Sequence, residues 1–94
     1  MGPSGRKEEK AGGSNLEFPK YKGNEDPSGW FARVEQFFRF QETPEENKVA
    51  LASYHMEGDA NQWWQWLDRT YATSGLPITW ARFREELWAR FGLA

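Results

Sequence analysis

The chain has 94 residues, which is enough for one small domain, since domains typically run about 50–250 residues. With 12 Lys and Arg against 14 Asp and Glu, the formal net charge is −2, which argues against a dedicated nucleic-acid binder or a polybasic membrane anchor. The chain has no cysteine and one histidine, which excludes disulfides, thiolate catalysis and zinc–thiolate or multi-histidine metal sites. No apolar run approaches the roughly 18 residues of a membrane span, and no signal peptide opens the chain, so we expect an intracellular, cytoplasmic protein.

The aromatic content is unusually high for so short a chain. Six tryptophans, seven phenylalanines and three tyrosines all lie between Phe18 and Phe91. Each such side chain can bury roughly 150–250 Å², which compensates for the large surface-to-volume ratio of a small domain. The composition therefore predicts a folded domain without disulfides.

The first 23 residues are predicted to form two different segments, a leader and an arm. Residues 1–14 carry no apolar side chain larger than alanine after Met1, so we expect a disordered leader. Part of this leader matches a cloning remnant. The alternative is that it is a charged interaction tail. Residues 15–23 place Leu16, Phe18 and Tyr21 on one apolar side, while Pro19 excludes a central strand. We therefore expect an arm that lies across the domain as an edge strand, with residues 15–94 forming the domain.

The first two of four predicted helices have clear start signals. Asp26 is suited to an N-cap, with Pro27 at the first helical position. Thr43 is suited to cap the second helix, with Glu46 completing a capping box. The four helices are expected at about 27–40, 44–56, 60–72 and 80–91.

The last two helices follow equally short connections. Gly58 offers a left-handed end to the second helix, and Asp59 is then placed to cap the third. Thr79 is placed to cap the fourth helix and Gly92 to end it.

Residues at helical spacing, most of them apolar, define the predicted buried faces. These are Trp30, Val34, Phe37, Phe38 and Gln41 with Phe31 at the border; Val49, Ala52, Ser53 and Met56; Ala60, Trp63, Trp64, Leu67 and Tyr71; and Trp80, Phe83, Leu87 and Phe91. Because the connections are short, sequential helices should pack as neighbours. The predicted fold class is all-α: a compact bundle of about four helices with an extended N-terminal arm.

The sequence offers no convincing catalytic constellation. The adjacent carboxylates at 45–46 and 85–86 point about 100° apart on a helix and are best interpreted as solvated surface. His55, near the end of the second helix, has no obvious nucleophile beside it. Arg82 and Glu86 are spaced for an intrahelical pair rather than for phosphate binding. We therefore predict that the chain has no catalytic, metal-binding or cofactor-binding residue and that it is not an enzyme.

Several large side chains lie off the predicted buried faces. They are Phe40, Leu51, Tyr54, Trp66 and Trp88. Neighbouring helices and the arm could cover them, because helices in a small bundle touch on two sides. Alternatively, they face a partner, since exposed aromatic residues often form interaction surfaces. Together with the arm residues Leu16, Phe18 and Tyr21, they are the candidate protein-interaction residues.

Three sequence blocks, in order, resemble the Gag capsid region of gypsy-class long-terminal-repeat retrotransposons. The blocks are FPKYKGNEDPSGWFARVEQFF, KVALASYHMEGDANQWWQWL and WARFREELWARFG, with a Gly-x-Ala-x-x-Trp-Trp link in the second. The matching positions are Phe18, Gly23, Asp26, Pro27, Trp30, Phe31, Glu35, Phe38, Lys48, Val49, Leu51, Ala52, Met56, Gly58, Ala60, Trp63, Trp64, Leu67, Trp80, Phe83, Leu87, Arg90 and Phe91. The resemblance covers about residues 18–92 and implies a fold like the retroviral capsid N-terminal domain.

The resemblance also implies a structural function: homotypic contacts with other Gag copies in virus-like particles. In the family a capsid C-terminal domain follows, and often a zinc knuckle that binds RNA, so we expect one domain of a longer protein that does not itself bind nucleic acid. The alternative is a host-domesticated module, similar to the lobe of the Arc protein that binds short hydrophobic peptides in a groove beside the arm. In that case Leu16, Phe18 and Tyr21 would border the groove.

Overall fold

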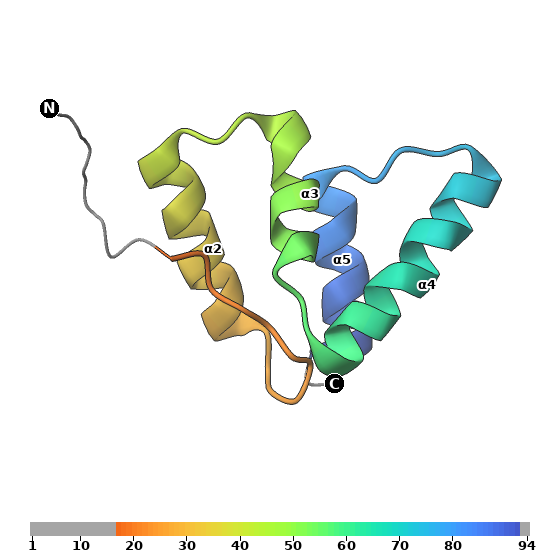
Figure 1. The fold of residues 1–94 in the computed structure, drawn as a ribbon, viewed down its shortest axis with the longest axis horizontal. Helices are drawn as coiled ribbons and strands as arrows, with labels where there is room; N and C mark the ends of the chain where they lie inside the picture. The colour runs from red at the N-terminus through yellow and green to blue at the C-terminus, as the bar shows by residue number, and fades with distance from the viewer. Residues whose placement is uncertain (1–16, 93–94) are drawn as a thin grey trace, which may run out of the picture.

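The computed structural model describes residues 17–92, and within them it is an all-α domain without a strand (Figure 1). The predicted leader and Leu16 lie outside the described residues. The helices are α2 (Ser28–Gln41), α3 (Glu45–Tyr54), α4 (Gly58–Ser74) and α5 (Trp80–Phe91). Helix α3 lies in the centre with α5 packed behind it, and α2 and α4 lie on either side (Figure 1). Within residues 17–92, the all-α prediction and the prediction of four helices are confirmed.

The start of α2 differs from the prediction by one residue. Pro27 is the N-cap, and its carbonyl accepts a hydrogen bond from the Phe31 N–H at 2.8 Å. Asp26 still contributes, because its carboxylate accepts a hydrogen bond from the Ser28 N–H at 2.7 Å.

The predicted side-chain caps of α3 and α4 are wrong. Pro44 is the N-cap of α3 and no side chain caps it, so the box expected from Thr43 does not form. Glu57, not Asp59, is the N-cap of α4, and it too makes no side-chain capping bond. Gly58 is left-handed as expected (φ +55°), but it begins α4 rather than ending α3. By contrast, the Thr79 cap of α5 is confirmed, since its hydroxyl accepts from the Arg82 N–H at 3.1 Å.

The N-terminal arm crosses the domain and reaches the α3–α4 connection (Figure 1). The Tyr21 N–H donates to the His55 carbonyl at 3.3 Å, and the Tyr21 carbonyl accepts from the Glu57 N–H at 2.9 Å. This is one parallel bridge, between Tyr21 and Met56, rather than the expected edge strand. Further along, the Lys22 carbonyl accepts from the Ala60 N–H at 3.1 Å and so caps the first turn of α4 from a distant segment.

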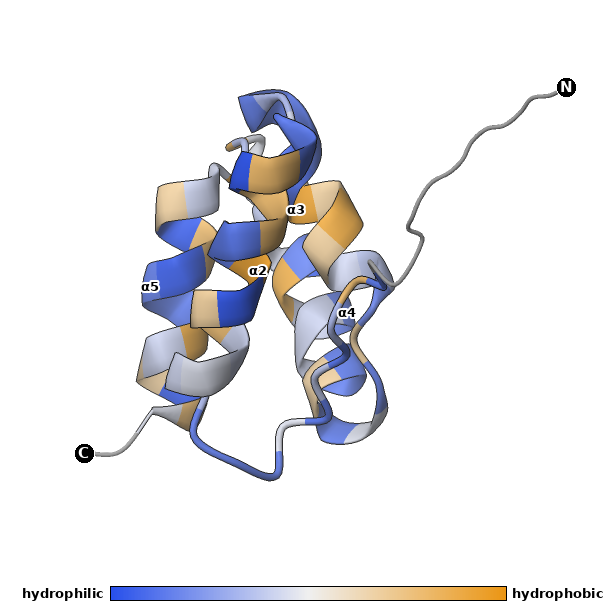
Figure 2. Cartoon of the chain, turned by 90° about the vertical axis from the view of Figure 1, so that its left-hand side faces the viewer, coloured by the Kyte–Doolittle hydropathy of each residue, from blue (hydrophilic) through white to orange (hydrophobic). Residues whose placement is uncertain are grey.

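The core is largely aromatic and joins the arm to all four helices. Its buried apolar members are Phe18, Tyr21, Trp30, Phe31, Val34, Phe38, Ala52, Met56, Ala60, Trp63, Leu67, Trp80, Phe83 and Leu87. Figure 2 shows hydrophobic turns on α3 and hydrophilic outer turns on α5, as expected for amphipathic helices around one core.

Some residues of the predicted faces lie at the edge of this core. Phe37, Val49, Trp64, Tyr71 and Phe91 are only partly buried and pack against it. Gln41 is exposed, and Phe31, placed at the border of its face by the periodicity, is buried. The Phe31 ring fills the space between α2 and α5, because Trp88 stacks on it at a centroid distance of 5.8 Å. The prediction for Gln41 is therefore wrong, whereas the main apolar faces are confirmed.

Candidate functional site

A shallow groove of about 630 Å³ runs between α2 and α3. Two of the candidate interaction residues, Leu51 and Tyr54, line it beside Phe37. Tyr54 is 83% exposed, so this face of α3 presents a nearly free aromatic ring. The remaining lining residues are Gln41, Thr43, Pro44, Asn47 and Ala50. We call this surface the α2–α3 groove.

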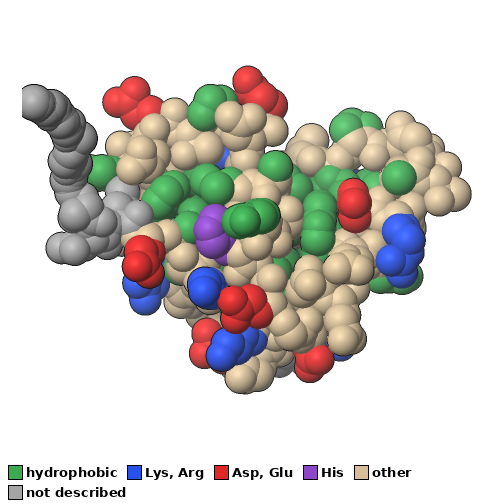
Figure 3. Space-filling view, viewed as in Figure 1, with side chains coloured by type: hydrophobic (Ala, Val, Ile, Leu, Met, Phe, Trp, Pro, Cys, Tyr) green, Lys and Arg blue, Asp and Glu red, His purple; other side chains and the backbone are tan. Residues whose placement is uncertain are grey.

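The arm approaches the α2–α3 groove through Phe18. The Phe18 ring packs edge-on against Phe37 at 4.9 Å between centroids and stacks on His55 at 4.5 Å. Phe18 itself is buried. Figure 3 shows apolar side chains gathered around the single histidine on this face. The histidine therefore sits in an apolar surface, and its Nδ1 lies 2.9 Å from the Leu51 carbonyl oxygen.

The second arm candidate, Tyr21, is fully buried and not available to a partner. Its ring stacks on Trp30 at 5.2 Å and meets Phe91 edge-on at 5.6 Å. Its hydroxyl donates to the Glu25 carbonyl. Desolvation by burial, followed by nearby carboxylates, raises the pKa of Tyr21 to about 12. The structure thus places Tyr21 in the core, where it holds the arm.

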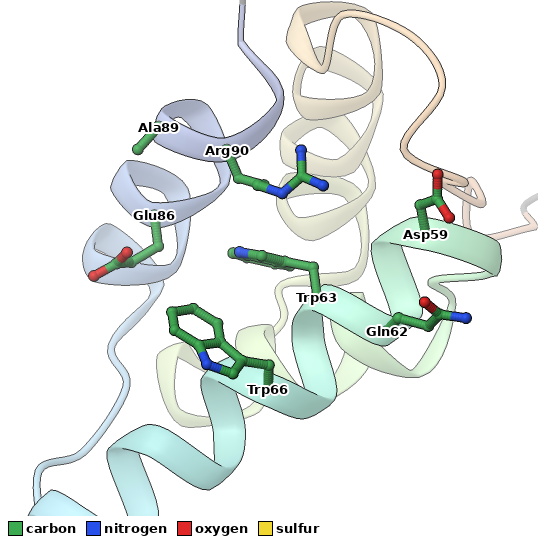
Figure 4. A pocket seen from close by; sticks show the side chains of 7 residues that line it. All are labelled: Asp59, Gln62, Trp63, Trp66, Glu86, Ala89 and Arg90. Atoms are coloured by element: carbon green, nitrogen blue, oxygen red, sulfur yellow. The ribbon is translucent and has the colours of Figure 1, made fainter.

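A second concavity, of about 650 Å³, lies between α4 and α5, and we call it the α4–α5 cleft (Figure 4). Its lining residues are Asp59, Gln62, Trp63, Trp66, Glu86, Ala89 and Arg90. Figure 4 shows the Trp63 ring between Arg90 on one side and Trp66 on the other. Trp66 is 52% exposed, whereas Trp63 is 8% exposed and also packs against Phe83 in the core. Of the candidate interaction residues, this cleft contains Trp66 alone.

The cleft carries charges of both signs. Glu86 accepts a hydrogen bond from the Tyr71 hydroxyl at 3.0 Å, and partial burial together with this bond raises the pKa of Tyr71. Arg82 pairs with Glu85 at 3.5 Å, so the predicted pair with Glu86 does not form. Glu85, three residues after Arg82, lies within reach of the Arg82 guanidinium, whereas the Glu86 carboxylate is hydrogen-bonded to Tyr71.

The other two off-face aromatics lie apart from both concavities. Phe40 is 71% exposed on α2 and lines neither of them. Trp88 is 37% exposed and stacks on Phe31, and the Arg84 guanidinium lies 5.4 Å from the Phe31 ring centroid. The five candidates from the helices therefore fall into four separate places rather than one patch.

One exposed apolar residue was not predicted from the sequence. Leu76, in the connection between α4 and α5, is 61% exposed. Leu76 precedes Pro77 in a loop, and loops lie at the surface, so its position in the sequence could have predicted that its side chain is exposed.

The described part of the chain contains no group of three or more His, Cys, Asp or Glu side chains placed to hold a metal ion. Among the helices of residues 17–92, none has both the length and the apolar content needed to cross a membrane. The described surface exposes several large apolar and aromatic side chains, among them Phe40, Tyr54 and Trp66.

The described part of the chain is a small helical domain with a largely aromatic core and several exposed aromatic side chains. A family model, that of the N-terminal capsid-like domain of the retrotransposon-derived protein PEG10, matches residues 15–92. The match spans all four helices and the arm, and the chain belongs to this capsid-like, retrotransposon-derived family. The resemblance to a Gag capsid domain is thereby confirmed, while the gypsy class stays a prediction. No curated protein and no solved structure gives a significant match.

Proposed function

We propose that this chain is a structural Gag-type domain whose exposed faces make homotypic contacts in capsid-like particles in the cytoplasm. The observation that carries the proposal is the family match across the whole described fold. A domain of this kind must be stiff and must present the same faces on every copy. The continuous aromatic core supports the first requirement.

Exposed aromatic residues support the second requirement. Trp66, Tyr54 and Phe40 keep more than half of their surface accessible. Large aromatic side chains contribute much of the binding energy at protein interfaces. A contact that is weak for one pair of molecules is strengthened when many copies bind together.

Sedimentation velocity of the chain over a wide concentration range tests the proposal. We expect the weight-average sedimentation coefficient to rise as the concentration approaches about 1 mM, which corresponds to a weak contact of about 4 kcal/mol. Replacing Trp66 and Trp88 by alanine identifies which face is used. A chain that stays monomeric up to about 1 mM contradicts a homotypic interface within this domain.

The α2–α3 groove favours a second function, the binding of short hydrophobic peptides from other proteins. The groove is lined by Phe37, Leu51 and Tyr54, and the arm residue Phe18 packs against Phe37 beside it, so an extended peptide would lie along apolar side chains. Titration with hydrophobic peptides should then shift the NMR signals of Phe18 and Tyr54 while leaving those of Trp66 unchanged. If no peptide shifts the groove signals, this second function is wrong.

A further inference from the structure

The α4–α5 cleft contains a buried hydrogen-bond donor that lacks an acceptor in the described part of the chain. The indole N–H groups of Trp30 and Trp80 donate to the Pro19 carbonyl at 2.9 Å and to Glu35 at 3.2 Å. The Trp63 indole, with 8% of the residue exposed, donates to no acceptor among residues 17–92. Figure 4 shows its nitrogen at the end of the ring that points across the cleft toward α5. Because buried indole N–H groups normally find a partner, an acceptor from outside residues 17–92 belongs here, and a bound molecule can supply it.

The neighbours of Trp63 specify what kind of segment fits. Trp66 offers an accessible aromatic face, and Arg90 and Gln62 offer further donors. A segment rich in carbonyl acceptors, with an apolar side chain and few N–H groups of its own, satisfies this lining. An X–Pro dipeptide has this chemistry, because proline lacks the N–H, and aromatic grooves bind proline-containing segments for the same reason.

The chain itself exposes such a dipeptide in the loop between α4 and α5. Leu76 is 61% exposed and precedes Pro77. Its N–H already donates to the Tyr71 carbonyl at 3.2 Å, whereas its own carbonyl accepts no hydrogen bond from residues 17–92. The loop therefore presents one free carbonyl and one apolar side chain.

The loop and the cleft lie at opposite ends of the same two helices (Figure 1). The cleft is built on the first half of α4 and the second half of α5, while the loop joins their other ends. From Trp63 to the end of α4 at Ser74 the helix rises about 16 Å. A molecule cannot place its own loop in its own cleft, but a second copy can.

The charges at the two ends are complementary. The cleft carries Asp59 and Glu86 against Arg90, an excess of one negative charge. Near the loop, Arg69 follows Trp66 by three residues, so the two share one side of α4, and Arg69 forms no salt bridge within residues 17–92. The loop end of one copy thus brings an unmatched cation to the acidic cleft of the next.

We propose that the Leu76–Pro77 loop of one copy docks in the α4–α5 cleft of a second copy, with the Leu76 carbonyl accepting from the Trp63 indole N–H. This inference rests on the proposed homotypic function and names its contact. The contact is head-to-tail, because different surfaces of the two copies meet. Each bound pair leaves one free loop and one free cleft, so the contact propagates into rings or filaments.

The test uses three variants, of which one changes the loop half of the contact and two change the cleft half. Leu76→Ser changes the exposed loop, and Trp66→Ser changes the exposed cleft wall, so neither change disturbs the core. Trp63→Phe removes the indole N–H together with part of the bicyclic ring, and it keeps an aromatic ring in the core. Tyr54→Ser is the control, because Tyr54 is exposed in the other groove. Circular dichroism checks that all four variants are folded.

Sedimentation velocity at rising concentration gives the readout. We expect the loop variant and both cleft variants to associate at least about tenfold more weakly than the wild type, and the control to associate like the wild type. An equimolar mixture of Leu76→Ser with Trp66→Ser has one intact pairing per two molecules, and it should form a heterodimer and nothing larger.

The outcomes separate this inference from the proposed function. If the wild type associates and the loop and cleft variants associate equally well, the docking is wrong while homotypic assembly stands. If both variants fail alone and the mixture stays monomeric, the head-to-tail pairing is also wrong. If the wild type is monomeric up to about 1 mM, both the docking and the homotypic function of this domain are contradicted.

Discussion

Replacing Tyr21 by phenylalanine isolates the contribution of one buried hydroxyl to the attachment of the arm. The ring contacts with Trp30 and Phe91 are kept, while the hydrogen bond to the Glu25 carbonyl is lost. Because Glu25 is exposed, water can satisfy its carbonyl in the variant. We therefore expect a loss of about 1 kcal/mol in the free energy of unfolding near neutral pH, which is the net value of one hydrogen bond.

The sign of this effect should reverse at high pH. Burial, and then the charges of Glu25 and Asp26, raise the pKa of Tyr21 from 10.0 to about 12 in the folded state. Above a pH of about 10 the unfolded chain loses this proton while the folded chain keeps it, so the unfolding free energy falls as the pH rises toward about 12. Two pKa units correspond to roughly 2.7 kcal/mol, all of which the phenylalanine variant avoids. The two proteins should be equally stable near a pH of about 11, and the variant should be more stable above it.

Urea denaturation followed by tryptophan fluorescence, at several values between about pH 8 and pH 12, measures both proteins under matched conditions. Every other titrating group, including Tyr71 with its raised pKa, is present in both proteins and cancels in the difference. A difference that stays constant across this range refutes the buried, proton-retaining state of Tyr21.

Three further tests concern a close backbone approach, a helix cap and the burial of two tryptophans. Gly23→Ala should destabilise the fold by about 1–3 kcal/mol in thermal or urea unfolding, because φ is +90° there and a Cβ would come within 2.9 Å of the Phe91 ring; an unchanged stability contradicts the close approach. Thr79→Ala should cost about 1 kcal/mol by losing the cap of α5, while Thr79→Ser should restore most of it. Trp63→Ala should cost about 3–5 kcal/mol and Trp66→Ala less than about 1 kcal/mol, and equal melting temperatures of these two variants would show that the burial on α4 is assigned wrongly.

The sequence was sufficient to predict features that depend on local chemistry. The helix faces follow from the spacing of apolar residues, and the Thr79 cap follows from a side chain that reaches an amide three residues on. Even where the helix boundaries shifted, as at Ser28 and Gly58, the apolar face stayed the same. Local patterns therefore predicted the four helices and most of the core.

Features that depend on distant segments could not be predicted in this way. Asp59 was a reasonable cap for α4 by local rules, but the helix begins at Gly58, and the Lys22 carbonyl of the arm accepts from the amide of Ala60 where a side-chain cap would otherwise bind. Likewise, nothing in the helical periodicity indicates that Trp63 and Arg90 face a common cleft, because that depends on how α4 and α5 are placed in space. The burial of Tyr21 is of the same kind, since it depends on the partners the arm meets.

The pairing of the arm with the start of α4 also links two segments in their exchange with solvent. The amide protons of Glu57 and Ala60 are held by carbonyl groups of Tyr21 and Lys22, so they exchange with deuterium only when the arm lifts away. The arm and the first turn of α4 therefore open as one cooperative unit. The protection of these two amides from exchange therefore measures how stably the arm is attached. A ligand that displaces the arm would raise the exchange rate of both amides, although it does not contact α4.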